Sequence, residues 1–166
     1  SGTLEYLAAR FQVTLSYYNP NIAPFSEYEK RRAELARLLR DMPLASPVAL
    51  LECPYDGEAF QALAQGLEDA PEGGARCMRC YRLRLEHTAR LAKELGFDYF
   101  TTTLSISPLK DAQALNRIGE GLAQQYGVAH LPADFKKKDG YKRSVQRSKE
   151  YGLYRQDYCG CIYSRR

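Results

Sequence analysis

Short β-rich runs alternate with longer helical runs along this 166-residue chain, and the alternation limits the possible folds more than any other feature. The expected strands are residues 13–18, 46–52, 98–104 and 128–131, and the expected helices are 26–40, 56–67, 75–95 and 111–126. Strands joined through crossover helices form a parallel sheet with helices on both faces. The sequence therefore predicts an α/β fold in three layers around a parallel sheet, with ligands bound beyond the carboxyl ends of its strands.

The first residues carry a helical pattern, with Leu4, Leu7, Ala8 and Phe11 at helical spacing. A parallel α/β chain normally opens with a strand, so we expect that a first strand is missing. The start at Ser1, without an initiator Met, agrees with that expectation.

Capping signals fix several of the expected helix ends. Ser26 and Glu29 have capping-box spacing at the start of the helix that runs to about residue 40. Asp56 and Asp111 are expected N-caps, and Gly96 stands where a left-handed C-terminal cap is expected.

Composition favours a globular protein that is not embedded in a membrane. Apolar residues make up 45% of the chain and charged residues 27%, and no apolar run approaches the roughly 20 residues of a membrane span. Four of the five cysteines are clustered, which is typical of metal or redox chemistry in a reducing compartment. We therefore expect a cytoplasmic protein.

Charge divides the chain into a core at residues 1–133 and a basic segment at 134–166. The second part holds ten Lys and Arg against four Asp and Glu, together with five of the thirteen tyrosines. Cations interleaved with aromatic rings suit a phosphate backbone with unstacked bases, although a solvated helix face is the ordinary alternative. The candidate nucleic-acid-binding residues are Lys137, Lys142, Arg143, Tyr154 and Arg155.

The clustered thiols are the strongest chemical signal in the sequence. Cys77 and Cys80 are three residues apart in the longest expected helix and so share one face. Cys159 and Cys161 are separated only by Gly160, which indicates a tight turn. Cys53 has no neighbouring thiol and is interpreted as a packing residue.

Three interpretations of the four clustered thiols stay open. They could be ligands of an iron–sulfur cluster, ligands of a four-thiolate zinc site, or, for Cys159 and Cys161, a redox dithiol. Four arginines near the first pair would offset the charge of a thiolate-rich centre or would simply form a solvated face: Arg76, Arg79, Arg82 and Arg84. The two histidines, His87 and His130, are interpreted as structural.

Several segments together resemble one known family. They are Tyr18-Asn19-Pro20-Asn21-Ile22, residues 76–84 (RCMRCYRLR), residues 101–104 (TTTL), Ser107-Pro108 and residues 152–161 (GLYRQDYCGC). In this order they resemble the motifs of the epoxyqueuosine reductases of the QueH type, through essentially the whole chain.

The resemblance implies a cobalamin-independent oxidoreductase that reduces epoxyqueuosine to queuosine at the wobble position of tRNA. It also implies a Rossmann-like fold akin to that of the tRNA-thiolating enzymes. A 4Fe-4S cluster would be held by Cys77, Cys80 and two adjacent cysteines of an N-terminal segment that this sequence lacks, so we expect a chain of these residues alone to be impaired. Cys159 and Cys161 would be a redox-active pair or ligands of a further, mononuclear iron.

Other functions and roles remain open at this point. The alternatives are a zinc-stabilised tRNA-binding module without chemistry of its own and a thiol–disulfide oxidoreductase built on Cys159 and Cys161. Asp157 is a possible proton donor, although it is also a possible turn cap. The sequence does not identify the electron donor.

Overall fold

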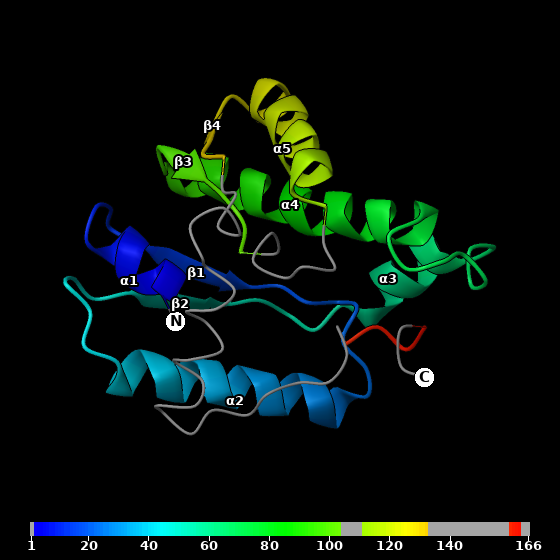
Figure 1. Cartoon of the computed structure of the whole chain (residues 1–166), viewed down its shortest axis with the longest axis horizontal. Helices are drawn as coiled ribbons and strands as arrows, with labels where there is room; N and C mark the ends of the chain where they lie inside the picture. Colours follow the sequence, from blue (N-terminus) through cyan, green and yellow to red (C-terminus); the bar gives the residue numbers. More distant parts are fainter. Residues whose placement is uncertain (1, 104–110, 133–159, 164–166) are drawn as a thin grey trace. The chain divides into compact units, whose positions relative to one another are not determined.

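The computed structural model describes residues 2–103, 111–132 and 160–163 (Figure 1). Its chain divides into two compact units. The first unit comprises residues 1–61 and 142–166, and of the second range only residues 160–163 are described. The second unit comprises residues 62–141. Both units combine helices with parallel strands. The predicted α/β class is therefore confirmed.

The first unit contains one parallel pair of strands joined by a helix. Its elements are α1 (Gly2–Ala8), β1 (Thr14–Tyr17), α2 (Phe25–Asp41), β2 (Ala49–Glu52) and the greater part of α3 (Gly57–Ala64). The strands pair in parallel from Thr14 with Ala49 to Tyr17 with Glu52. Helix α2 is the crossover and lies along the pair (Figure 1). The carboxyl ends of β1 and β2 therefore lie side by side.

The start of α2 differs from the predicted capping box. The N-cap is Pro24, whose φ of −71° suits a helix entry, and no side chain caps the first turn. The carboxylate of Glu29 instead accepts hydrogen bonds from Arg32. The prediction that Ser26 and Glu29 cap this helix is wrong, because Pro24 starts the helix before Ser26 is reached.

Two apolar clusters hold the first unit together. Leu4, Leu38 and Met42 connect α1 with the end of α2. Tyr17, Ile22 and Tyr28 connect the end of β1 with the start of α2. The second cluster fixes the segment between β1 and α2.

The second unit packs two long helices against a short parallel pair. Its elements are α4 (Ala75–Leu95), β3 (Tyr99–Phe100), α5 (Ala112–Tyr126) and β4 (Ala129–His130). β3 and β4 pair in parallel, and α4 packs against α5. The core consists of the apolar faces of these elements: Tyr81, Leu85, Ala89, Ala92, Phe100, Leu115, Leu122 and Val128.

The predicted caps of the long helices are confirmed. The Asp111 side chain accepts a hydrogen bond from the backbone of Ala114, and Gly96 ends α4 in the left-handed conformation. The Asp56 cap of α3 is also present, through a hydrogen bond from the backbone of Ala59. All four strands occur near their predicted positions, but β3 and β4 are only two residues long.

Gly119 of α5 packs against the side chain of His130. A Cβ atom at position 119 would clash with Nε2 of the imidazole. The His130 ring is buried, and its Nδ1 lies 3.1 Å from a carboxylate oxygen of Glu120. His130 therefore fills space against α5, as a structural residue does.

Within the described ranges, no helix combines the length and the apolar character needed to cross a bilayer. The predicted division into residues 1–133 and 134–166 stays a prediction, because residues 133–159 lie outside the described ranges.

Candidate functional site

Cys77 and Cys80 lie in the first turns of α4. Their spacing of three residues on a continuous helix puts both thiols on the same side of it. Cys77 is half-buried and Cys80 is buried. The backbone N–H of Gly73 donates a hydrogen bond to Sγ of Cys77 over 3.2 Å. Such a hydrogen bond stabilises a thiolate, which is the form that binds metal.

The turn before α4 aims this N–H group at the sulfur. Gly73 has a φ of +84°, which favours glycine, and the N–H of Gly74 donates to the carbonyl oxygen of Pro71 over 2.9 Å. A Cβ atom at Gly74 would approach that oxygen to 3.0 Å. The glycine pair therefore gives the turn its shape.

Arg76 holds the preceding loop against the thiol-bearing helix. Its side chain is 3% exposed, and Nη1 donates hydrogen bonds to the carbonyl oxygens of Leu67, Glu68 and Ala70 at 3.1, 3.2 and 2.8 Å. Of the two alternatives given for Arg76, a solvated face is therefore wrong. Arg79 and Arg82 are exposed, and for them both alternatives stay open.

The described residues near Cys77 and Cys80 supply two thiols and no more. Across the described parts of the chain, no group of three or more His, Cys, Asp or Glu side chains is arranged to hold a metal ion. A cluster with four thiolate ligands would therefore take half of its ligands from elsewhere. The pair fits that role, and it fits half of a zinc site equally well.

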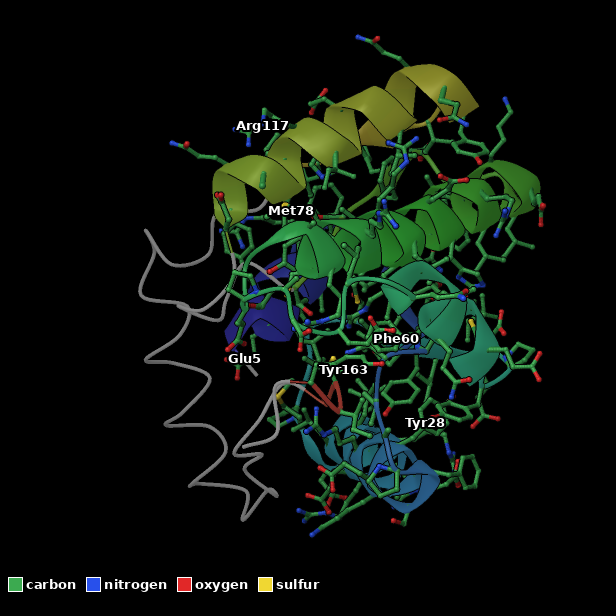
Figure 2. The ribbon with its side chains drawn as sticks, turned by 90° about the vertical axis from the view of Figure 1, so that its right-hand side faces the viewer. Glu5, Tyr28, Phe60, Met78, Arg117 and Tyr163 are labelled. Carbon is green, nitrogen blue, oxygen red and sulfur yellow. The ribbon has the colours of Figure 1, made fainter. Side chains whose placement is uncertain are left out.

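The Cys-Gly-Cys segment is described from Gly160 onward and docks onto the segment between β1 and α2. The N–H of Ala23 donates to the carbonyl oxygen of Gly160 over 2.8 Å. Gly160 has a φ of +111°, and Cys161 beside it is buried. Figure 2 shows Tyr163 near Phe60 of α3, with ring centroids 6.3 Å apart. The described part of this motif, Gly160 with Cys161, is therefore attached beyond the carboxyl end of β1, where the sheet rule places a ligand site.

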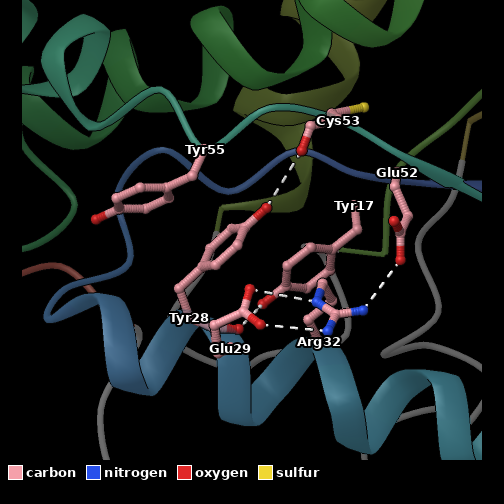
Figure 3. Close-up of a pocket in the computed structure, with 7 residues that line it drawn as sticks. All are labelled: Tyr17, Tyr28, Glu29, Arg32, Glu52, Cys53 and Tyr55. Carbon is pink, nitrogen blue, oxygen red and sulfur yellow. Dashed lines mark hydrogen bonds and ion pairs between the residues drawn. The ribbon is translucent and has the colours of Figure 1, made fainter.

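A cavity of about 340 Å³ opens at the carboxyl ends of β1 and β2 (Figure 3). Its lining residues are Tyr17, Tyr28, Glu29, Arg32, Glu52, Cys53 and Tyr55. The Arg32 guanidinium contacts both carboxylates, at 3.2 Å from Glu29 and 3.0 Å from Glu52. These groups partner one another, and one guanidinium with two carboxylates leaves the cavity wall with a formal charge of −1.

Tyrosine hydroxyls brace the walls of this cavity. Tyr17 donates to the carbonyl oxygen of Tyr28 over 2.9 Å, and Tyr55 donates to that of Ile22 over 2.6 Å. Burial raises the pKa of Tyr28, and the charge of Glu29 adds to the effect. Burial also raises the pKa of Tyr55. The cavity lies at the edge of the sheet where the sequence predicted that ligands bind, but the sequence did not identify the residues that line it.

Cys53 lies at the end of β2, with its sulfur 3.4 Å from the hydroxyl of Ser16. Cys53 also lines the cavity, so its packing role stays a prediction. No disulfide joins the cysteines among the described residues.

The remaining predicted site residues lie outside the described ranges. They are Cys159, Asp157 and the candidate nucleic-acid-binding residues Lys137, Lys142, Arg143, Tyr154 and Arg155. Cys77 and Cys80 belong to the second unit and Cys161 to the first, so each part of the site is described by itself.

Comparisons with known proteins agree on one family. A family model described as epoxyqueuosine reductase QueH matches residues 1–166. The chain is 42% identical to the QueH protein of Streptococcus pyogenes over 98% of its own length and 64% of the relative's. It is 39% identical to that of Staphylococcus epidermidis, over 98% and 70%, and 38% identical to that of Thermotoga maritima, over 89% and 77%. By this evidence the chain belongs to the epoxyqueuosine reductase QueH family.

Proposed function

We propose that this chain is part of an oxidoreductase that reduces epoxyqueuosine to queuosine in tRNA. The observation that carries the proposal is the match of the family model to all 166 residues. The named relatives include regions that this chain does not span, since it covers 64% of the Streptococcus pyogenes protein. The activity is therefore proposed for the whole protein.

The reaction removes one oxygen atom from a three-membered ring. Two electrons and two protons enter, both carbon–oxygen bonds break, the oxygen leaves as water, and a carbon–carbon double bond remains. A two-electron reduction of this kind needs a centre that carries electrons, which zinc is not.

Cys77 and Cys80 are proposed to provide two of the four thiolates of a 4Fe-4S cluster, which would supply electron transfer when bound. Three features support this role: the shared helix face, the hydrogen bond from Gly73 to Cys77 Sγ, and the loop fixed by Arg76. The other two ligands are proposed to lie in the part of the protein that this chain does not span.

Cys159 and Cys161 are proposed to form the redox-active pair, with binding of a mononuclear iron as the alternative. The docking of Gly160 beyond the carboxyl end of β1 supports a place near the substrate. The basic residues Lys137, Lys142 and Arg143, with Tyr154 and Arg155, are proposed to contact the tRNA through phosphate and base stacking. A Rossmann-like three-layer architecture and a cytoplasmic location belong to the same proposal.

The test is purification without oxygen of the protein that includes the upstream coding region, followed by metal and sulfide analysis and an assay on epoxyqueuosine-containing tRNA. We expect bound iron with sulfide and formation of queuosine, detected by mass spectrometry of the nucleosides. Cys77→Ser and Cys80→Ser are expected to lose iron and activity, whereas Cys53→Ser is the matched control and keeps both. A colourless protein with stoichiometric zinc and no queuosine formed would instead support a tRNA-binding module.

A further inference from the structure

Gly160, the central residue of the Cys-Gly-Cys motif, is held by a binding surface that no motif of the sequence predicts. We call this surface the Gly160 seat: the backbone of Ile22 and Ala23 together with the side chains of Ile22, Glu27 and Arg31. The Gly160 carbonyl accepts a hydrogen bond from Ala23, and the carbonyl of Ile22 is held by the Tyr55 hydroxyl. The seat is therefore anchored to Gly160 and to Tyr55, the third residue after the end of β2.

An ion pair of low exposure forms the second wall of the seat. Arg31 Nε lies 2.9 Å from a carboxylate oxygen of Glu27, and the two side chains are 8% and 14% exposed. The Arg31 Nη1 atom lies 3.0 Å from the position that a Cβ atom at residue 160 would occupy. The guanidinium therefore lies directly against the turn.

Only glycine fits at position 160. Its φ of +111° is a conformation that residues with a side chain rarely adopt. A Cβ atom there would also lie 2.7 Å from Cγ1 of Ile22, a buried side chain. Conformation and space thus restrict the same residue, the one between the two thiols.

We propose that the Gly160 seat sets the dithiol–disulfide equilibrium of Cys159 and Cys161, with Arg31, Glu27 and Gly160 as positioning residues. The inference rests on the proposed function, in which this pair is redox-active. A disulfide needs Cα atoms about 4.4–6.8 Å apart, whereas two residues of extended chain span up to roughly 7 Å. A seat that fixes the bend at Gly160 therefore favours the disulfide, and loss of the seat favours the dithiol.

The equilibrium can be measured with glutathione. Both thiols lose a proton and together give up two electrons as the Sγ–Sγ bond forms, and one glutathione disulfide becomes two glutathione molecules. The tryptic peptide Gln156–Arg165 contains only these two cysteines, so alkylation followed by mass spectrometry of this peptide isolates the pair from the other thiols.

The variants are Gly160→Ala, Arg31→Gln and Glu27→Gln, with Arg31→Lys as the conservative change. We expect about a tenfold lower equilibrium constant for disulfide formation in the first three, a shift of about 30 mV toward easier reduction. Arg31→Lys should recover part of the loss because it keeps a cation beside Glu27.

Two controls separate the seat from general destabilisation. Gly66 has a similar φ of +82°, but no atom lies within 4 Å of the position that a Cβ would take there, so Gly66→Ala adds backbone strain alone. Arg37 forms an ion pair with Glu34 on the same helix, so Arg37→Gln removes an ion pair away from the seat. Both controls should keep the wild-type equilibrium constant.

The proposal is overturned if Gly160→Ala, Arg31→Gln and Glu27→Gln all match the wild type, or if the controls shift as far as they do. If circular dichroism shows that Gly160→Ala does not fold, the equilibrium constants of Arg31→Gln and Glu27→Gln decide whether the proposal stands. Absence of a disulfide in the wild type at every glutathione ratio also overturns it. The reductase assay is independent: a wild type that forms no queuosine but shows the expected shifts refutes the proposed function and leaves the seat supported.

Discussion

The N–H group of Gly73 donates a hydrogen bond to the sulfur of Cys77, and the left-handed conformation of Gly73 is what aims it there. An alanine at this position costs about 1 kcal/mol in backbone strain without any steric clash. The strain should turn the N–H away from the sulfur. We expect Gly73→Ala to lose bound metal to a chelator several times faster than the wild type.

The control for that experiment is Gly66→Ala, which has a similar positive φ and no thiol contact. Equal rates of metal loss in both variants would show that strain in general, and not the hydrogen bond to sulfur, is responsible.

Replacing Arg76 should destabilise the second unit. Its Nη1 atom binds three backbone carbonyl groups from a buried position, and Arg76→Met would leave those acceptors without their charged donor. We expect a loss of about 3 kcal/mol in the free energy of unfolding, measured with urea. The exposed neighbour gives the comparison: Arg79→Met should change that free energy by no more than about 0.5 kcal/mol.

Two glycines of α5 should respond to alanine with opposite signs. Gly119→Ala places a methyl group against the buried His130 ring, and we expect a loss of about 3 kcal/mol or more. Gly121 is exposed with open space around it, so Gly121→Ala should stabilise the helix by about 1 kcal/mol. Thermal unfolding monitored by circular dichroism measures both, and equal signs would contradict the packing described here.

Alkaline pH should weaken the first unit through Tyr28. Burial, with the charge of Glu29, raises the pKa of Tyr28 above its unfolded value of about 10, so the folded state keeps the phenol proton longer. Its contribution to stability is complete below pH about 10 and is lost as pH rises from there through the folded pKa. Urea unfolding from pH 8 to 11 should show this decline.

In Tyr28→Phe the ring stays but the ionisable group is gone, so we expect a shallower decline. The exposed tyrosine Tyr99 offers the control, since Tyr99→Phe should reproduce the wild-type slope. A Tyr28→Phe slope equal to that of the wild type would assign the alkaline loss to other groups.

Binding of tRNA should depend steeply on salt and on the basic segment. Each Lys or Arg that neutralises a phosphate adds to the slope of the logarithm of affinity against the logarithm of salt concentration. We expect Lys137→Glu and Lys142→Glu to weaken binding of an anticodon stem-loop and to reduce that slope, in gel-shift or anisotropy measurements. Lys93→Glu on α4 is the charge-matched control, and an effect as large as that of Lys137→Glu would remove the basic segment from the interface.

Local signals in the sequence predicted much of the framework. Asp111, Gly96 and Asp56 cap the helices as expected, because a cap depends on residues only a few positions away. The capping box at Ser26 failed because Pro24, just outside the motif, starts the helix earlier. Residues next to each helix end thus explain both the correctly predicted caps and the wrong capping box.

Contacts between distant residues were not predictable in this way. Arg76 appears in the sequence as one of four arginines around a thiol pair, and only the folded loop shows that it binds three carbonyl groups. The docking of Gly160 on Ala23 likewise joins segments near opposite ends of the chain. The two thiol pairs could be identified from spacing, whereas the surfaces that hold them could not.

The contact between Gly119 and His130 also limits the order in which this protein can change. A methyl group at 119 would occupy space that the imidazole already fills, so the larger residue becomes tolerable only after position 130 has accepted a smaller one. In the reverse direction, position 119 would have to return to glycine before histidine could return at position 130. The two sites can therefore drift only as a coupled pair, with the histidine changing first.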